Sequence, residues 1–394
     1  MSSDNNDYLS FHNAGRIVIE DLPSLYDSSL YVFPFRYFPL SAYFFTPFSL
    51  LGLKLGYFTF QIFNFFLNFI NIYLIFKIIQ VYKILNPDSI FNYKTNNPKE
   101  IFTQPENESI LHQCAIFLIM APQFMNYFLG QINIMVSFFT LASILYFLKG
   151  GAKNDFLGGF LLGIGILIKP TLILILVFII PFAYERKSKK LLLSLKQAIL
   201  RLSGISILLI ISGIYFLVYP NMFNDFIKVN LAGKYTYNLG GELEINPSFS
   251  LTRILLIIFD LISLNISNSI VFIIILLLFL VPIYFFFVKS CNQPNKLIYG
   301  YFAGILVTLI AYFDTWPHHL VVSAPFLILF ILLNKDFDHI KLIKYMHYLL
   351  CTIILGFWGL FYLTYEIFPF NIGGMFLLLI LYYGVFLYFR NGFT

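Results

Sequence analysis

Apolar stretches of about 20 residues recur from residue 55 to the C-terminus, and only short polar stretches separate them. A helix of that length crosses the hydrocarbon core of a bilayer, so the pattern predicts a polytopic transmembrane protein of the all-α class. We expect about eleven spans joined by short loops. They lie at residues 57–82, 111–128, 131–148, 155–168, 171–183, 198–219, 269–288, 297–312, 319–333, 346–366 and 372–389.

Lysine and arginine residues gather in alternate loops between the expected spans. One set of loops is rich in them, as at residues 186–190, and positively charged loops stay on the cytoplasmic side. The other set is then extracytoplasmic. The chain therefore divides into an extracytoplasmic N-terminal segment, 1–54, and a transmembrane helical domain, 55–394, which includes the extracytoplasmic loop 220–250.

The N-terminal segment 1–54 contains Arg16 and Arg36, and neither a signal peptide nor an earlier span precedes it in this sequence. Another segment has to carry it across the membrane. The simplest expectation is that a transmembrane helix upstream of residue 1 is missing from this chain.

Composition excludes several classes of protein. With 59% apolar and 11% charged residues, the chain is no ordinary soluble domain. No basic run alternates with aromatic residues on a soluble module, so we expect no nucleic-acid partner. Cys114, Cys291 and Cys351 are odd in number and widely spaced, which predicts packing residues. No His, Asp or Glu cluster has metal-ligand spacing within one helix, so we expect neither a metal nor another cofactor.

The apolar stretch 155–184 would form a helix of roughly 45 Å, too long for one span and short for two. Pro170 lacks an amide donor, so we expect the chain to turn back after Lys169. Bent backbone at membrane depth is tolerated where it is buried in protein or lines a cavity. Lys169 is therefore a candidate site residue, and the alternative is a lysine that reaches the interface from a helix end. Four glycines before it permit close helix packing: Gly158, Gly159, Gly163 and Gly165.

Two further features of the apolar stretches are polar. Four amide side chains form a stripe on one face of the first span, for interhelical hydrogen bonds or for a substrate path. They are Gln61, Asn64, Asn68 and Asn71. Segment 251–264 is too short to span, so we expect a re-entrant or interfacial helix there. Its Arg253 binds an anion, or pairs with Glu242, Glu244 or a lipid phosphate.

Two segments on the expected outer side are dense in groups able to do chemistry. The N-terminal segment contains Asp4, Asp7, His12, Arg16, Glu20, Asp21, Asp27 and Arg36. The second segment contains Asp314, Trp316, His318 and His319. A histidine pair at the mouth of two helices takes protons, binds phosphate or packs as a structural element.

Five segments along the chain resemble, in order, the motifs of family 87 glycosyltransferases of the C superfamily. These enzymes are polyprenyl-phosphate-mannose-dependent mannosyltransferases and their relatives. The motifs are the N-terminal segment, "GQIN", "LGIGILIKPT", "INPSFSLTR" and "TWPHHLVVSAPFLILF". The resemblance runs from about residue 7 to residue 330. It implies a multi-span enzyme with a catalytic cavity on the extracytoplasmic face.

By this resemblance, Asp7 is the catalytic base, and His318 or His319 is the family's functional histidine. Lys169 and Arg253 are implied to bind the donor phosphate. Other cavity residues that the resemblance implies are Tyr37, Gln131, Asn133, Asn246, Ser248 and Trp316.

The implied reaction moves a sugar, most simply mannose, from a polyprenyl-phosphate donor to an acceptor hydroxyl with inversion. The acceptor is a glycan, a glycolipid or a protein, and membrane lipid surrounds the enzyme. We expect an integral multi-pass protein of the plasma membrane in a prokaryote, or of the endoplasmic reticulum in a eukaryote. A transporter or flippase is the alternative, because it also uses broken helices and polar groups in the membrane.

Overall fold

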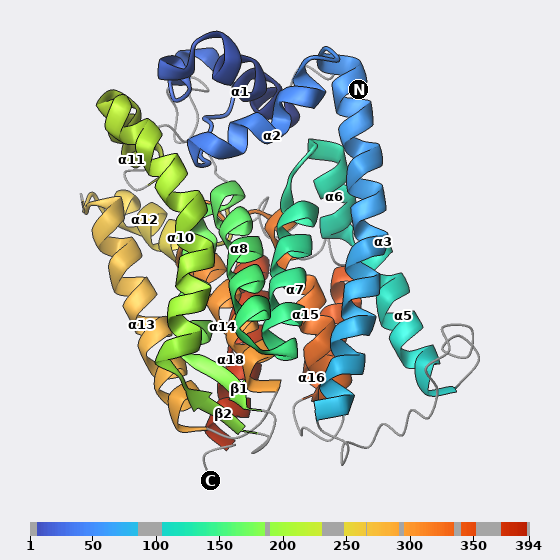
Figure 1. Ribbon diagram of the computed structural model, residues 1–394. Helices are drawn as coiled ribbons and strands as arrows, with labels where there is room; N and C mark the ends of the chain where they lie inside the picture. Colours follow the sequence, from blue (N-terminus) through green and yellow to red (C-terminus); the bar gives the residue numbers. More distant parts are fainter. Residues whose placement is uncertain are drawn as a thin grey trace.

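The computed structural model describes residues 6–85, 105–185, 190–230, 248–264, 266–290, 295–334, 340–351 and 372–391. Within these ranges the chain is helical except for loops and one short hairpin (Figure 1), which confirms the expected all-α membrane fold. The helices up to residue 179 are α1 (Tyr8–Glu20), α2 (Pro39–Ser49), α3 (Leu53–Leu85), α5 (Pro105–Ile119), α6 (Ala121–Leu129), α7 (Asn133–Lys149), α8 (Ala152–Ile168) and α9 (Leu176–Ile179).

The hairpin follows α9 and consists of β1 (Phe182–Glu185) and β2 (Lys190–Leu193), which pair antiparallel. The later helices are α10 (Leu195–Val218), α11 (Pro220–Asn230), α12 (Leu251–Leu261), α13 (Asn268–Lys289), α14 (Asn295–Ala311), α15 (Leu320–Leu333), α16 (Ile340–Cys351) and α18 (Ile372–Asn391). Short 3-10 helices cover Leu22–Ser24, Ser28–Leu30, Pro170–Ile175 and Pro317–His319.

Four of the described helices are long and apolar enough to cross a membrane, namely α3, α10, α13 and α18. The pair α6 and α7 counts as a fifth if its bend of 119° lies within one broken span. The sequence predicted one helix over residues 111–128, but the structure divides this range between α5 and α6. The break occurs because the chain is extended at Met120 and Pro122 cannot donate to the preceding turn. The expected span 346–366 lies largely outside the described residues.

The turn predicted after Lys169 is present. Helix α8 ends there with an extended residue, and the chain returns through the 3-10 helix Pro170–Ile175 and α9 to the hairpin. The expected span 171–183 is therefore not a continuous α-helix. The hairpin lies at the end of the bundle opposite α1 and α2 (Figure 1).

Helices α8 and α10 pack closely, as the glycines of α8 predicted. A Cβ atom at Gly159 would lie 2.2 Å from the carbonyl oxygen of Arg201, and one at Gly204 would lie 2.3 Å from that of Phe156. Arg201 also forms a buried ion pair with Asp155 at 2.8 Å. Small residues thus let the two backbones approach, while the ion pair joins the helices near the hairpin.

The amide stripe of α3 forms hydrogen bonds between helices. Asn68 and Gln123 exchange bonds of 3.2 and 3.1 Å, and Asn71 donates to the carbonyl of Ile134 at 3.1 Å. Gln61 and Asn64 donate to the carbonyls of Tyr127 and Gln131. Of the two roles left open, the geometry favours interhelical bonding.

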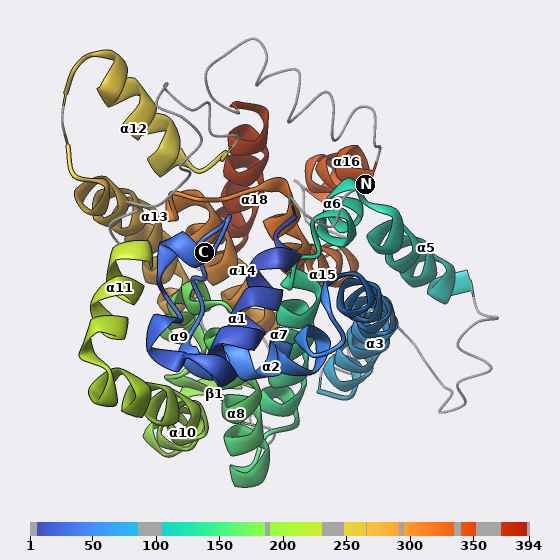
Figure 2. The ribbon, with the colours of Figure 1, turned by 90° about the horizontal axis from the view of Figure 1, so that it is seen from above.

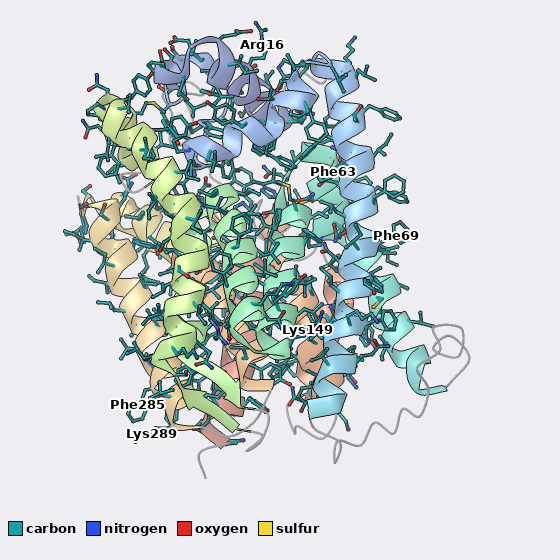
Figure 3. All side chains as sticks on the ribbon, in the orientation of Figure 1. Arg16, Phe63, Phe69, Lys149, Phe285 and Lys289 are labelled. Atoms are coloured by element: carbon teal, nitrogen blue, oxygen red, sulfur yellow. The ribbon has the colours of Figure 1, made fainter. Side chains whose placement is uncertain are left out.

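Helices α1 and α2 lie across one end of the bundle, as the view from above makes clear (Figure 2). Arg16 lies at this end, whereas Lys149 and Lys289 lie at the end with the hairpin (Figure 3). The core is centred on α14 and α15, whose apolar side chains are buried almost throughout. Many apolar side chains of α3, α10 and α13 are exposed, which suits a surface that faces lipid.

Candidate active site

A cavity of about 250 Å³ lies beneath the N-terminal segment, where several turns meet. Six separate parts of the chain form its wall: the start of α1, residues 33–37, the turn before α7, the turn after α8, the end of α11 and the loop before α15. The polar residues that line it are Asp7, Ser10, Arg36, Tyr37, Gln131, Lys169, Thr171, Asn230, Tyr312, Asp314, Trp316, His318 and His319.

Asp7 occupies the turn just before α1. Its carboxylate accepts a hydrogen bond from the side-chain amide of Gln131. Gly130, with a φ of +68°, turns the chain there. The backbone amide of Gln131 donates to the backbone carbonyl of Asn126. Burial raises the pKa of Asp7 to about 6, with a further upward effect of Asp314, while the Gln131 bond and Arg36 oppose the rise.

Lys169 reaches the cavity because α8 ends at this residue. Its ammonium donates to the side-chain oxygen of Asn133 at 2.6 Å, and Asn133 in turn donates to Asn126 at 3.1 Å. The "GQIN" turn and the lysine-proline turn are thus joined by hydrogen bonds. Because Lys169 is held within the cavity wall, its role as a lysine that reaches the lipid interface is disfavoured.

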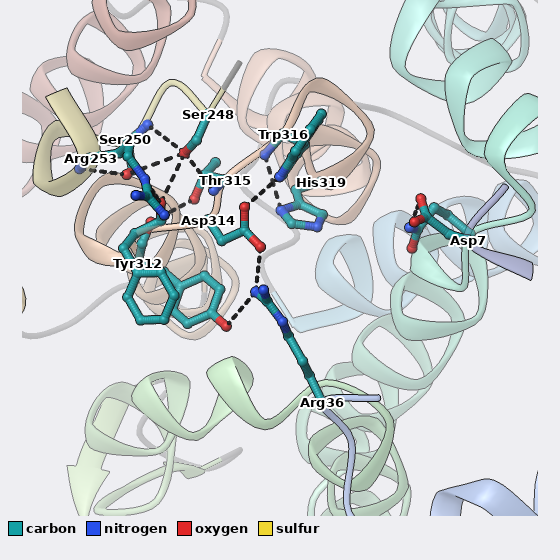
Figure 4. Close-up of polar contacts among 12 residues, drawn as sticks. Asp7, Arg36, Ser248, Ser250, Arg253, Tyr312, Asp314, Thr315, Trp316 and His319 are labelled. Atoms are coloured by element: carbon teal, nitrogen blue, oxygen red, sulfur yellow. Dashed lines mark hydrogen bonds and ion pairs between the residues drawn. The ribbon is translucent and has the colours of Figure 1, made fainter. Parts of the chain in front are cut away.

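Arg36 and Asp314 form an ion pair in the cavity wall (Figure 4). Asp314 also accepts a bond from the indole of Trp316 at 2.5 Å, and Arg36 lies 3.5 Å from the hydroxyl of Tyr312. The sequence placed Arg36 and Asp314 among the groups able to do chemistry without a specific role, and it did not single out Tyr312 or Asn230. The available signal was that opposite charges flank recognised residues, Arg36 beside Tyr37 and Asp314 beside the tryptophan-histidine segment.

The two histidines line the cavity next to each other. The backbone amide of Trp316 donates to Nδ1 of His319 at 3.2 Å, which leaves Nε2 of that ring to carry the proton. Burial, and then the nearby Lys169, lowers the pKa of His319 well below its usual range. His319 is therefore a neutral hydrogen-bond donor. His318 stacks on the ring of Trp316, with ring centroids 6.2 Å apart.

Three residues predicted for the site do not line the cavity, namely Asn133, which holds Lys169 from behind, Ser248 and Arg253. Ser248 accepts a bond from the amide of Thr315 at 2.9 Å, and Arg253 donates from Nε to the carbonyl of Phe313 at 3.2 Å. Neither is among the residues that line the cavity. Both brace the loop that holds Asp314 and the histidines, which differs from the phosphate contact expected of Arg253.

Some predicted features lie outside the described residues. These are Asn246, Glu242, Glu244 and the rest of loop 220–250 between residues 231 and 247. Within the described ranges, no group of three or more His, Cys, Asp or Glu side chains has the arrangement of a metal site. Whether the protein uses a metal is untested, so the expected absence of one stays a prediction.

Asp7 lies across from the network around Arg36 (Figure 4). The cavity therefore has the Asp7 carboxylate on one side and the Arg36–Asp314 ion pair, with Trp316 and His319, on the other. A family model for glycosyltransferase family 87 matches residues 35–311, more than half of the chain.

This chain belongs to glycosyltransferase family 87. It is a membrane glycosyltransferase, in agreement with the resemblance seen in its motifs. No curated protein and no solved structure matches it. The matched range is shorter than the resemblance predicted, since it begins after Asp7 and ends before Asp314. Roles for Asp7 and the histidines therefore rest on the geometry of the cavity.

Proposed function

We propose that this glycosyltransferase transfers mannose from a polyprenyl-phosphate donor to an acceptor hydroxyl, with inversion, on the extracytoplasmic side of the membrane. The observation that carries the proposal is that Asp7 and Lys169 line one cavity. A carboxylate that can accept a proton thus lines the same cavity as a lysine that can bind a phosphate. Transfer from a sugar phosphate needs both groups.

Asp7 acts as the general base. As the acceptor oxygen forms its bond to the anomeric carbon, Asp7 takes the hydroxyl proton, and the bond from that carbon to the phosphate oxygen breaks. A carboxyl group with a pKa of about 6 is ionised at neutral pH and is still a better base than an ordinary aspartate. Attack in line with the leaving phosphate inverts the anomeric centre.

The leaving phosphate gains negative charge and needs stabilisation more than it needs a proton. Burial lowers the pKa of Lys169 to about 7, and an anionic phosphate beside it favours the charged form, so the lysine supplies a positive charge when the donor is bound. The neutral His319 donates a hydrogen bond to that phosphate from Nε2. Arg36 and Asp314 form an ion pair in the wall of the same cavity, so together they add no net charge. Arg253 contributes by bracing the loop 312–316 through the carbonyl of Phe313.

The substrates account for the membrane location of the enzyme. A polyprenyl chain is soluble in the bilayer, so its phosphate meets the protein at the membrane surface. The acceptor is a glycan, a glycolipid or a protein, and the membrane is the plasma membrane of a prokaryote or the endoplasmic reticulum of a eukaryote. The proposed chemistry requires no metal and no cofactor.

Transport of a lipid-linked or small solute is the competing function. A transporter gathers its polar groups near the midplane, at the interface of repeated halves. The cavity of this protein lies beneath α1 at one end of the bundle, and the family is one of transferases. A polymerase or ligase that uses lipid-linked oligosaccharide would share this location, and analysis of the product separates it from the proposed enzyme.

The test is transfer of labelled mannose from polyprenyl-phosphate-mannose into lipid extract by membranes that contain the protein. We expect Asp7→Asn to lower turnover by about a hundredfold or more, since a positioned base contributes on that order. Asp27→Asn is the matched control, because Asp27 lies in the same N-terminal segment but bonds to Ser29 outside the cavity.

Both parent and Asp27→Asn should transfer mannose equally. Turnover unchanged in Asp7→Asn would remove Asp7 as the base. If the parent transfers no mannose but transfers the sugar of another polyprenyl phosphate, the proposed donor sugar is wrong and the proposed reaction class stands. A version extended upstream tests whether a preceding helix positions Asp7.

A further inference from the structure

A second concave region lies at the end of the bundle opposite the catalytic cavity. It is an apolar groove of about 890 Å³, with walls from α10 and α13 and a floor from α9. Leu202, Val177 and Val281 are among the side chains that line it, and Phe285 and Lys289 mark its end. Figure 3 places those two residues at the hairpin end of α13.

The groove exists because the chain between residues 170 and 179 does not form a full helix. Pro170 starts a 3-10 helix, and α9 that follows has only four residues. Helix α9 packs against α14, whereas α10 packs mainly against α8. Helices α10 and α13 therefore stand on either side of a thin segment, which leaves an open space between them.

The groove faces outward and is apolar along its length. Val281 is 58% exposed and Leu202 is 41% exposed, although both belong to helices apolar enough to cross a membrane. Side chains of this kind contact hydrocarbon. The natural content of the groove is therefore an acyl chain.

A single positive charge, that of Lys289, lies at one end of the groove. The ammonium of Lys289 lies 4.2 Å from the ring centroid of Phe285, which holds it beside the groove. Lys296 lies near the same end of α13, where its ammonium donates to the carbonyl of Val288 at 3.4 Å. Of the described residues that line the groove, Lys289 is the one with a charged side chain. The charge complements a phosphate.

The length of the groove fits one leaflet. From Leu280 to Lys289 helix α13 rises by roughly 14 Å, close to half of the ~30 Å hydrocarbon thickness of a bilayer. An acyl chain that follows this wall would reach the midplane while its headgroup stays beside Lys289.

We propose that this groove binds one anionic phospholipid, with an acyl chain along α9 and α13 and the phosphate against Lys289. The site is separate from the catalytic cavity, because the two share no lining residue. It does not depend on the identity of the sugar donor. The bound lipid fills the space left by the short return segment and joins α10 to α13.

The test measures retention of phosphatidylglycerol or phosphatidylcholine by the full-length protein in detergent, with native mass spectrometry of titrated lipid. We expect the parent to retain phosphatidylglycerol preferentially. Lys289→Gln should weaken that binding about fivefold, since one lysine near an anionic headgroup contributes on the order of that factor. Binding of phosphatidylcholine should stay unchanged.

Lys149→Gln is the matched control. Like Lys289, Lys149 is an exposed lysine in the last turn of a helix and lies at the same end of the bundle. Its ammonium also lies near an aromatic ring, 5.2 Å from the ring centroid of Tyr146. Lys149 differs in that it does not line the groove. The Lys149→Gln variant should bind phosphatidylglycerol as strongly as the parent does. Val281→Trp, at an exposed position where it should not impair folding, should fill the groove and reduce retention of both lipids.

Three results would overturn the proposal. One is an equal loss in both lysine variants, which would mean a general effect of surface charge. Another is unchanged retention in Lys289→Gln and Val281→Trp. The third is displacement of phosphatidylglycerol by polyprenyl phosphate at equal concentration, which would assign the groove to an isoprenoid lipid.

Discussion

The carboxyl group of Asp7 owes its properties to a residue 124 positions away, Gln131, which donates a hydrogen bond to it. Burial raises the pKa of Asp7 to about 6, and the Gln131 bond lowers it by stabilising the ionised form. The proposed base has to be ionised to act. Transfer should therefore increase as the pH rises through about 6.

Substitution of Gln131 tests this directly. In Gln131→Ala the carboxylate loses the donor that stabilises it, so its pKa rises and the acid limb of kcat/KM should move to higher pH. The shift should be about one pH unit, the order of one hydrogen bond to a charged group. The measurement is kcat/KM for mannose transfer as a function of pH.

Gln61→Ala provides the control for that experiment. Gln61 bonds to the carbonyl of Tyr127, close to the same turn, without touching Asp7. The acid limb of kcat/KM in Gln61→Ala should coincide with that of the parent. An acid limb that does not move in Gln131→Ala would mean that another group is the titrating base.

At the scale of elements, the contact of α8 with α10 sets the position of Lys169. Gly204 of α10 lies so close to α8 that an added Cβ would meet the carbonyl oxygen of Phe156 and the amide of Phe160, 2.3 and 2.7 Å away. Backbone atoms cannot move aside as a flexible side chain can. Helix α8 ends at Lys169, so a displaced α8 would also move the lysine in the cavity wall.

We expect Gly204→Ala to lower the free energy of unfolding by about 1–3 kcal/mol, the range for overpacking, and to lower transfer activity with it. Gly213→Ala is a control on the same helix, because nothing lies within 4 Å of a Cβ atom there. It should keep the stability of the parent or gain slightly, since alanine favours helix. Detergent unfolding followed by circular dichroism measures both, and equal effects at the two positions would contradict close packing.

At the scale of the whole molecule, the polar cavity and the exposed lysines of α7 and α13 lie at opposite ends of the bundle. The distribution of positive residues predicts that the lysine end is cytoplasmic. The catalytic cavity would then face outward, as a donor that carries its sugar on the outer leaflet requires.

Thiol labelling of intact cells tests this orientation. In a background whose natural cysteines are replaced by alanine, an impermeant reagent should label Arg16→Cys and spare Lys149→Cys until the membrane is opened. Arg16 is suitable because its side chain is 55% exposed. The reverse labelling pattern would place the cavity on the cytoplasmic side and overturn the proposed location of the reaction.

Several parts of this protein were determined by the sequence alone, because they depend on neighbouring residues. Long apolar runs produced the spanning helices α3, α10, α13 and α18. Pro170 ended α8 at Lys169 because a proline lacks an amide donor wherever it occurs. The order of motifs also identified the family, which the match over residues 35–311 confirms.

Only the tertiary structure decided which of these residues meet. Arg36 and Asp314 lie 278 positions apart and still form an ion pair, whereas Arg253, which was expected to bind the donor phosphate, lies behind the loop before α15. Local pattern specifies where a helix begins and ends but not which neighbour it packs against. Contacts between distant segments depend on how helix faces fit together, so the membership of the cavity required the packed bundle.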